Sequence, residues 1–320
     1  MLLKNKKFLV TGGAGFIGSN LAIKLIEDGA QVTILDALLP DCGGDLFNLK
    51  VVNGRYEFVK SEMQEVNELI SIVEDKDFIF NLSGRISHVG SIDEPYLDWQ
   101  SNSFAHLNLL EACLITKSNA KILFASTRQV YGKPLYLPLD EKHPVCPIDL
   151  NGVHKFAGEY YHKIYSQLFD LKTISLRLTN TYGPRLCIKN SKLGFINWFL
   201  NRALLDESIS LFDSGLILRD FNYVDDVVDA MLLAVENNNC VGKVFNLGGE
   251  QATLRDIAEK LISLTAKGKI EIVQTPQERE KINLGNCYSS YELFKKITGW
   301  VPKIGLDKGL CETVKFFKSY

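Results

Sequence analysis

The chain lacks a strong charge of either sign and has no long apolar run. Its 36 basic and 38 acidic residues nearly cancel, which leaves a formal net charge of −2 over 320 residues. A chain so close to neutrality has no basic surface of the kind that nucleic acids and anionic membranes require. No segment approaches the roughly 18 apolar residues of a membrane span. We therefore expect no nucleic-acid or membrane partner, and any anionic ligand must be held by a few local basic side chains.

The chain also lacks paired cysteines. No two of its seven cysteines have the spacing of a metal-binding or redox motif. They are Cys42, Cys113, Cys146, Cys187, Cys240, Cys287 and Cys311. Scattered cysteines in a chain of this length indicate reduced thiols, so we expect a cytoplasmic protein without a metal site. The basic start is followed by an apolar run of only residues 8–10, which is too short for a signal peptide.

What the chain does contain is an alternation of short β-type runs and longer amphipathic stretches. The runs at 8–11, 31–35, 56–60, 77–82, 120–126 and 172–178 predict strands, and those at 17–28, 66–73, 104–114 and 152–168 predict helices. This order predicts an α/β fold with a doubly wound parallel sheet. After Pro184 the rhythm loosens, with helical patterns at 195–205, 224–235, 254–264 and 291–297. We expect a first domain at 1–180, to which 220–246 return, and a smaller C-terminal α/β substrate lobe at 181–320.

A glycine-rich turn joins the first strand to the first helix. It runs Thr11-Gly-Gly-Ala-Gly-Phe-Ile-Gly18. Gly12, Gly15 and Gly18 allow a tight turn, close approach of the backbone to a pyrophosphate, and close packing of the helix on the strand. Asp36 follows about 20 residues later, where a carboxylate binds the adenosine ribose and repels a 2′-phosphate. The pattern predicts a Rossmann domain that binds NAD rather than NADP.

Five further segments carry recognisable patterns. They are Asn81-Leu-Ser-Gly84, the stretch 102–112 that begins with Asn102, and the segments 124–132, 177–184 and 219–226. Together with the glycine turn they resemble the motifs of the extended short-chain dehydrogenases/reductases, the family of the nucleotide-sugar epimerases and dehydratases. The resemblance covers essentially the whole chain.

The resemblance implies NAD as the cofactor, a nucleotide-diphosphate sugar as the substrate, and a homodimer formed through 104–114 and 152–168. Thr127, position 151 and Lys155 fall at the catalytic positions. The implied cofactor contacts are Gly12, Gly15, Phe16, Ile17, Gly18, Asp36, Glu62, Leu82, Ser83, Gly84 and Lys155. The implied substrate contacts are Arg85, Ser87, Arg128, Asn180, Arg185, Arg219 and Arg279. Arginine suits a pyrophosphate because its planar guanidinium offers paired donors.

The chain departs from the family at one catalytic position. The family helix carries Tyr-x-x-x-Lys, whereas this chain has Asn151-Gly-Val-His-Lys155. Asparagine has no ionisable group and cannot take the hydroxyl proton during hydride transfer, and loss of such a base costs about 10²–10⁴ in rate. Thr127 with an ordered water, His88, His154, Tyr131 and Tyr182 are the candidate substitutes. We expect Asn151 and Thr127 to hydrogen-bond the sugar hydroxyl or a water, and Lys155 to hold the nicotinamide ribose.

The residues after Thr127 bear on the reaction. Dehydratases of the family carry an Asp-Glu pair there, but this chain has Arg128-Gln129, which cannot perform that proton chemistry. We expect oxidation of the sugar at C4, with release of a 4-keto sugar. The overall pattern resembles enzymes of bacterial capsule synthesis that act on a GDP-linked heptose. The alternatives are a 4-epimerase that retains NADH and a binding protein that has lost its chemistry.

Overall fold

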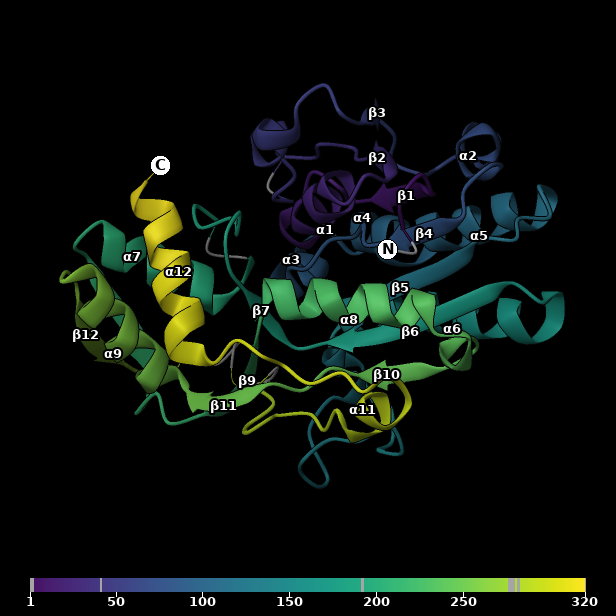
Figure 1. The fold of residues 1–320 in the computed structure, drawn as a ribbon. Coiled ribbons are helices and arrows are strands. Elements are labelled where there is room, and N and C mark those ends of the chain that lie inside the picture. The colour runs from purple at the N-terminus through teal and green to yellow at the C-terminus, as the bar shows by residue number, and fades with distance from the viewer. Residues whose placement is uncertain (1–2, 41, 191–192, 276–279, 281–282, 320) are drawn as a thin grey trace.

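The computed structural model describes residues 3–40, 42–190, 193–275, 280 and 283–319. Its centre is a seven-stranded sheet in the order β10-β6-β5-β4-β1-β2-β3 (Figure 1). Every neighbouring pair in this sheet is parallel. The predicted doubly wound α/β fold is confirmed. The strands are β1 (Lys7–Thr11), β2 (Gln31–Leu35), β3 (Glu57–Val59), β4 (Phe78–Asn81), β5 (Lys121–Thr127), β6 (Lys172–Leu178) and β10 (Val244–Asn246).

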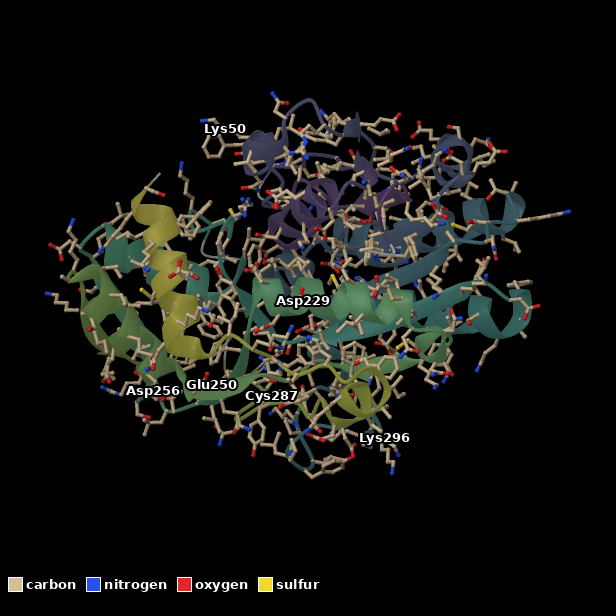
Figure 2. All side chains as sticks on the ribbon, in the orientation of Figure 1. Lys50, Asp229, Glu250, Asp256, Cys287 and Lys296 are labelled. Carbon is tan, nitrogen blue, oxygen red and sulfur yellow. The ribbon has the colours of Figure 1, made fainter. Side chains whose placement is uncertain are left out.

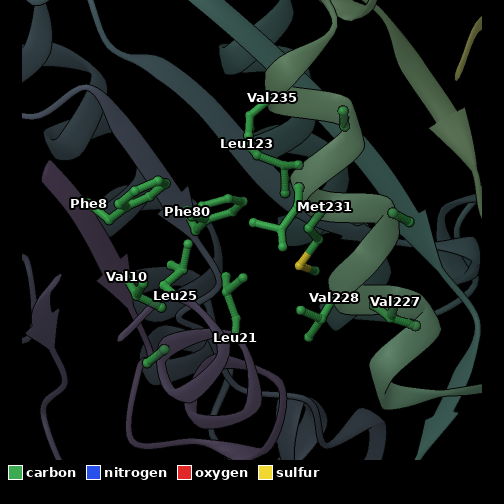
Figure 3. Packing of buried hydrophobic residues seen from close by; sticks show 14 of the residues in the cluster. Phe8, Val10, Leu21, Leu25, Phe80, Leu123, Val227, Val228, Met231 and Val235 are labelled. Carbon is green, nitrogen blue, oxygen red and sulfur yellow. The ribbon is translucent and has the colours of Figure 1, made fainter. Parts of the chain in front are cut away.

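Helices cover both faces of this sheet. On one face, α1 (Phe16–Glu27) and α8 (Val224–Glu236) lie side by side, and their apolar side chains meet Phe8, Val10 and Phe80 of the strands (Figure 3). On the other face, α2 (Val66–Val73), α5 (Ala105–Ile115) and α6 (Leu150–Phe169) pack on the alternate strand residues, such as Leu9 and Ile79. Successive side chains of a strand point to opposite faces, so continuous apolar strands build both cores.

The second part of the molecule is the lobe at the left of Figure 1. It contains a three-stranded sheet of β7 (Asn180–Tyr182), β9 (Leu218–Tyr223) and β11 (Glu250–Thr253), and a pair of parallel strands, β8 (Ser208–Phe212) and β12 (Lys269–Val273). Helices α7 (Phe195–Leu204), α9 (Leu254–Thr265) and α12 (Leu306–Lys318) supply its core. The chain also returns to the large sheet, because α8, β10, α11 (Glu292–Thr298) and Trp300 belong to the first core.

The elements expected from the sequence occur with small shifts of their ends, but the segment between β4 and α5 holds helices that were not expected. They are α3 (His88–Asp93), α4 (Pro95–Trp99) and the π-helical turn η2 (Gln100–Phe104). Short helical turns of 3₁₀ type also occur at η1 (Leu46–Val52), η3 (Arg128–Tyr131) and η5 (Asn238–Cys240). The π turn contains the buried Asn102, and such turns are frequent at functional sites.

Within the described ranges, no helix is long and apolar enough to cross a membrane. The same part of the chain shows no group of three His, Cys, Asp or Glu side chains that could hold a metal ion.

Candidate active site

A cleft lies at the carboxyl ends of β1, β2, β3 and β4. Turns that follow these strands form its wall, and the loop that carries Leu186 and Cys187 contributes from the lobe. Among the predicted cofactor residues, Lys155 is not part of the lining. The others line the cleft: Gly12, Gly15, Phe16, Ile17, Gly18, Asp36, Glu62, Leu82, Ser83 and Gly84. Ligands of open α/β sheets bind at this edge.

Two glycines of the turn after β1 are required by close contacts. A Cβ atom on Gly18 would lie 2.2 Å from the carbonyl oxygen of Gly12, and one on Gly12 would lie 2.9 Å from the backbone of Ser83. Gly12 also has a positive φ of 65°. The turn therefore packs against the end of β4, and residues of the first turn of α1 line the cleft. The unpaired backbone N–H groups of a helix N-terminus suit a pyrophosphate.

Asp36 is held rigidly at the end of β2. Its Oδ2 accepts a hydrogen bond from the N–H of Ala14 (3.0 Å), and its Oδ1 accepts one from the N–H of Leu38 (2.9 Å). The carboxylate is thus tied to the glycine-rich turn, and it faces the cleft together with the exposed Glu62. A fixed carboxylate beside a glycine turn fits the two hydroxyls of an adenosine ribose.

Lys155 lies behind the wall of this cleft. It is 6% exposed, and its Nζ donates to the carbonyls of Ser83 (3.3 Å) and Ala125 (3.5 Å) above the ring of Phe124. A Cβ atom on Gly84 would lie 2.8 Å from this Nζ. Burial lowers the pKa of Lys155 to about 8, although the charge of Asp98 opposes the shift. Only the backbone of Gly84 separates this cation from the cleft. A cation at such a position is suited to hold a ribose hydroxyl and to stabilise a nearby oxyanion.

Asn151 is one helical turn before Lys155 on α6, and its side chain is already bound within the protein. It is 3% exposed, and its Nδ2 donates to the carbonyl of Arg85 (2.8 Å) and to Asp98 Oδ2 (3.0 Å). Asp98 Oδ1 lies 2.7 Å from His154 Nδ1. Both amide hydrogens of Asn151 are therefore used, and only its carbonyl oxygen remains to orient a hydroxyl or a water.

Sequence reasoning missed Asp98, which connects these residues. The carboxylate is 1% exposed and belongs to α4. Proline at the first turn of a helix is a start signal, and Pro95 occupies that position here, so the helix could have been found from the sequence. Its contact with α6 could not, because Asp98 and Asn151 are 53 residues apart.

Thr127 ends β5, where its Oγ1 accepts a hydrogen bond from the N–H of Gln129 (3.2 Å). The hydroxyl caps the short turn η3 and keeps its own proton available as a donor. Position 127 thus lies at the carboxyl end of the strand next to β4, on the edge where the cleft opens.

Two of the arginines predicted to contact the substrate, Arg128 and Arg219, differ in their surroundings. Arg128 is buried, and its Nη1 donates to Asp220 Oδ1 (2.5 Å), Thr179 Oγ1 (2.9 Å) and the carbonyl of Cys287 (3.2 Å). Arg219 donates to the backbone carbonyls of Leu218 and Gly285. Burial and the like charge of Arg128 lower the pKa of Arg219 to about 10. An arginine beside a second cation and bound to carbonyls is suited to an anion, whereas Arg128 has the environment of a structural ion pair.

The other predicted substrate residues lie in three places. Asn180 donates to the carbonyl of Asp220 (2.9 Å), beside these arginines. Arg85 and Ser87 line a second hollow that adjoins the cleft, where Arg85 forms an ion pair with Glu94 and Ser87 caps α3. Arg185 bridges η1 and α1 through the Asn48 carbonyl (3.1 Å) and Asn20 Oδ1 (2.9 Å). Arg279 lies outside the described residues.

The fold and the cleft define a dinucleotide-binding protein of the α/β class with a smaller second lobe. Residues 8–248 match the family model described as "NAD dependent epimerase/dehydratase family". The chain belongs to this family, and it is an NAD-dependent enzyme of the oxidoreductase type that acts on a nucleotide sugar.

Three similar proteins illustrate the relationship. The UDP-glucose 4-epimerase of Mycolicibacterium smegmatis is 30% identical over 315 residues, which cover 97% of this chain and 98% of that protein. The UDP-glucose 4-epimerase structure of Thermotoga maritima with UDP-glucose is 32% identical with a TM-score of 0.89, over 98% of this chain and 99% of that one. The UDP-glucose 4-epimerase structure of Thermus thermophilus with NAD is 29% identical with a TM-score of 0.86, over 98% and 99%.

Proposed function

We propose that this enzyme interconverts nucleotide-diphosphate sugars by oxidation at C4, with a UDP-linked hexose as substrate and a 4-epimerised sugar as product. The observation that carries the proposal is Lys155, a buried cation directly behind the wall of the dinucleotide cleft and one helical turn from Asn151. The similarity to UDP-glucose 4-epimerases over nearly the whole chain supports epimerisation over release of the keto sugar.

The side chains divide the chemistry among them. Bound NAD supplies the hydride acceptor. Lys155 binds the ribose of the cofactor and lowers the energy of the developing alkoxide, while Thr127 donates to the sugar oxygen and the Asn151 carbonyl orients it. Arg219 and Asn180 hold the diphosphate. A positioned donor and a buried cation act strongly here because little water surrounds them.

The test is to incubate the NAD-loaded protein with a panel of UDP-, GDP- and dTDP-linked sugars and to analyse the products by mass spectrometry and NMR. We expect an isomer of a UDP-hexose and no net NADH. A panel in which every sugar is recovered unchanged would contradict the proposal.

A second candidate is a dehydrogenase that releases a 4-keto sugar, with a GDP-linked heptose of capsule synthesis as its substrate. Asn151 is the observation that favours it. An epimerase needs an acid–base group that both takes a proton from O4 and returns a proton to it, whereas a dehydrogenase only has to remove the proton. A keto product with equimolar NADH in the same panel would establish this reaction. A catalytically impaired binding protein, the third expectation, has the least support because the family consists of enzymes.

We also propose that the enzyme is a cytoplasmic homodimer, with 1–180 and 220–246 as the NAD-binding part and 181–320 as the substrate lobe. The thiol state of the seven cysteines supports a reducing compartment. Apolar side chains on the outer surface of α6 and α4 support the dimer: Leu150, Val153, Tyr160, Leu168, Tyr96 and Trp99.

A further inference from the structure

Oxidation of a sugar hydroxyl releases a hydride and a proton, and the proton needs an acceptor near Lys155. Both candidate phenols, those of Tyr131 and Tyr182, are poor proton acceptors. Tyr131 is fully buried, donates to Asn246 and accepts from Arg177, and burial raises its pKa to about 12. Tyr182 is 1% exposed, and burial beside the charge of Glu250 raises its pKa well above the usual range. A buried phenol whose pKa is raised in this way stays protonated, so it cannot accept a proton from a substrate.

His154 has a different environment. Its imidazole Nδ1 lies 2.7 Å from Asp98 Oδ1, and the side chain remains 13% exposed while Asp98 is 1% exposed. An ionised carboxylate only accepts hydrogen bonds, so Nδ1 carries the proton and Nε2 is left as a base. The same carboxylate binds Asn151 through its other oxygen (3.0 Å).

A continuous set of contacts links this pair to the cleft. The carbonyl of Arg85, a residue of the cleft lining, accepts from Asn151 Nδ2 (2.8 Å) and from Asn102 Nδ2 (2.9 Å). Asn151 connects in turn to Asp98 and Asp98 to His154. Lys155 follows His154 directly on α6, and Asp98 acts electrostatically on it. His154 therefore belongs to the same network as the catalytic lysine.

We propose that His154, oriented by Asp98, is the proton acceptor of the reaction, and that one water molecule carries the proton to its Nε2, on the side of the imidazole away from Asp98. This assignment rests on the proposed function. The C4–H bond breaks with its electron pair going to the nicotinamide, the O4–H bond breaks with its proton going through the water to Nε2, and a C=O bond forms. Asp98 stabilises the resulting imidazolium. An epimerisation is completed when the hydride returns to the opposite face of C4 and a proton returns from Nε2 through the water to O4. A base can act through one water, and a carboxylate on the far nitrogen raises its competence.

The first measurement is single-turnover hydride transfer by the NAD-loaded His154→Gln variant, followed at the absorbance of NADH. We expect a loss of about 10²–10⁴, the contribution of a general base, with unchanged affinity for NAD and for UDP. Added imidazole should restore part of the rate. Lys155→Met is the matched control, because it is also impaired but has no missing imidazole to replace. A His154→Gln rate within threefold of the wild type, or equal stimulation of both variants by imidazole, would overturn the assignment.

The second measurement uses the wild-type protein and requires neither catalytic turnover nor a folded variant. Diethyl pyrocarbonate acylates unprotonated imidazole, and peptide mass spectrometry reports each histidine separately. In the wild-type protein loaded with NAD, we expect His154 to react and saturating UDP-glucose to protect it. Equal labelling with and without the sugar would overturn the proposal. A wild-type protein that changes no nucleotide sugar would instead overturn the proposed function.

Discussion

At the scale of single residues, the site depends on a few side chains whose surroundings change their chemistry. Asp36, Lys155 and Asn151 are all buried or nearly so, but each interacts differently: Asp36 with backbone N–H groups, Lys155 with carbonyls, and Asn151 with a carboxylate. The residue type alone does not distinguish these cases, and the hydrogen-bond partners do.

Asp36 should make the protein bind NADH in preference to NADPH. We expect the wild type to bind NADH much more tightly than NADPH, because a fixed carboxylate repels a 2′-phosphate. Asp36→Ser should narrow the ratio of the two dissociation constants by at least about tenfold, which corresponds to 1.4 kcal/mol. Isothermal titration calorimetry measures both ratios. Gly305→Ala, a change in the lobe where the added Cβ meets only the end of a side chain, is the control. A wild type that binds NADPH as tightly as NADH would contradict the role of Asp36.

Lys155 should make stability depend on pH. Burial lowers its pKa to about 8 from the ordinary 10.5, so between these values the unfolded chain holds a proton that the folded chain does not. Stability must then rise with pH through this window, by up to about 3 kcal/mol relative to Lys155→Met. Urea unfolding from pH 7 to 11 gives the free energy of unfolding of the wild-type and Lys155→Met apoproteins. The contributions of the other titrating groups cancel in the difference between these two free energies. A difference that stays constant with pH would show that Lys155 is not desolvated.

At the scale of elements, one buried ion pair joins the large sheet to the lobe. Arg128 of η3 meets Asp220 of β9, whose carboxylate also accepts from the N–H of Ser289 (3.0 Å). Figure 2 shows Cys287, whose carbonyl accepts from Arg128, beside the strands of the lobe. Asp220 thus connects three segments that are far apart in sequence, and it fixes β9, the strand that carries Arg219.

This arrangement predicts that substitution of Arg128 mainly lowers stability, whereas substitution of Arg219 mainly weakens ligand binding. Arg128→Met should lower the free energy of unfolding by about 3–5 kcal/mol, because it leaves a buried carboxylate without its partner. Arg219→Ala should weaken UDP binding by about 1.5–3 kcal/mol, the contribution of a hydrogen bond to a charged group, with a smaller loss of stability. Chemical denaturation and calorimetry with UDP separate the two quantities. The reverse pattern would exchange the roles assigned to these residues.

At the scale of the whole molecule, the outer surface of α6 should be an interface between two copies of the chain. Val153 and Tyr160 are each 46% exposed and lie seven residues apart on one side of the helix. Two charges placed there by Val153→Glu with Tyr160→Glu should halve the molar mass measured by light scattering, because burying a charge without a partner is costly. Leu216→Glu, at a 60% exposed position in the lobe, should leave the mass unchanged. A wild type that is already monomeric would contradict the expectation.

The sequence by itself determined the large sheet, the helices that cover it and the cleft around the glycine turn. Each of these depends on residues close together in the chain: the alternation of apolar runs, the strand–turn–helix context of residues 11–18, and an acid at the end of the next strand. Only the tertiary structure decided that Asn151 and His154 share Asp98, and that Arg128 is neutralised by Asp220. Those pairs join positions 53 to 92 residues apart, and a local pattern cannot specify which distant groups meet when burial forces polar side chains to find partners.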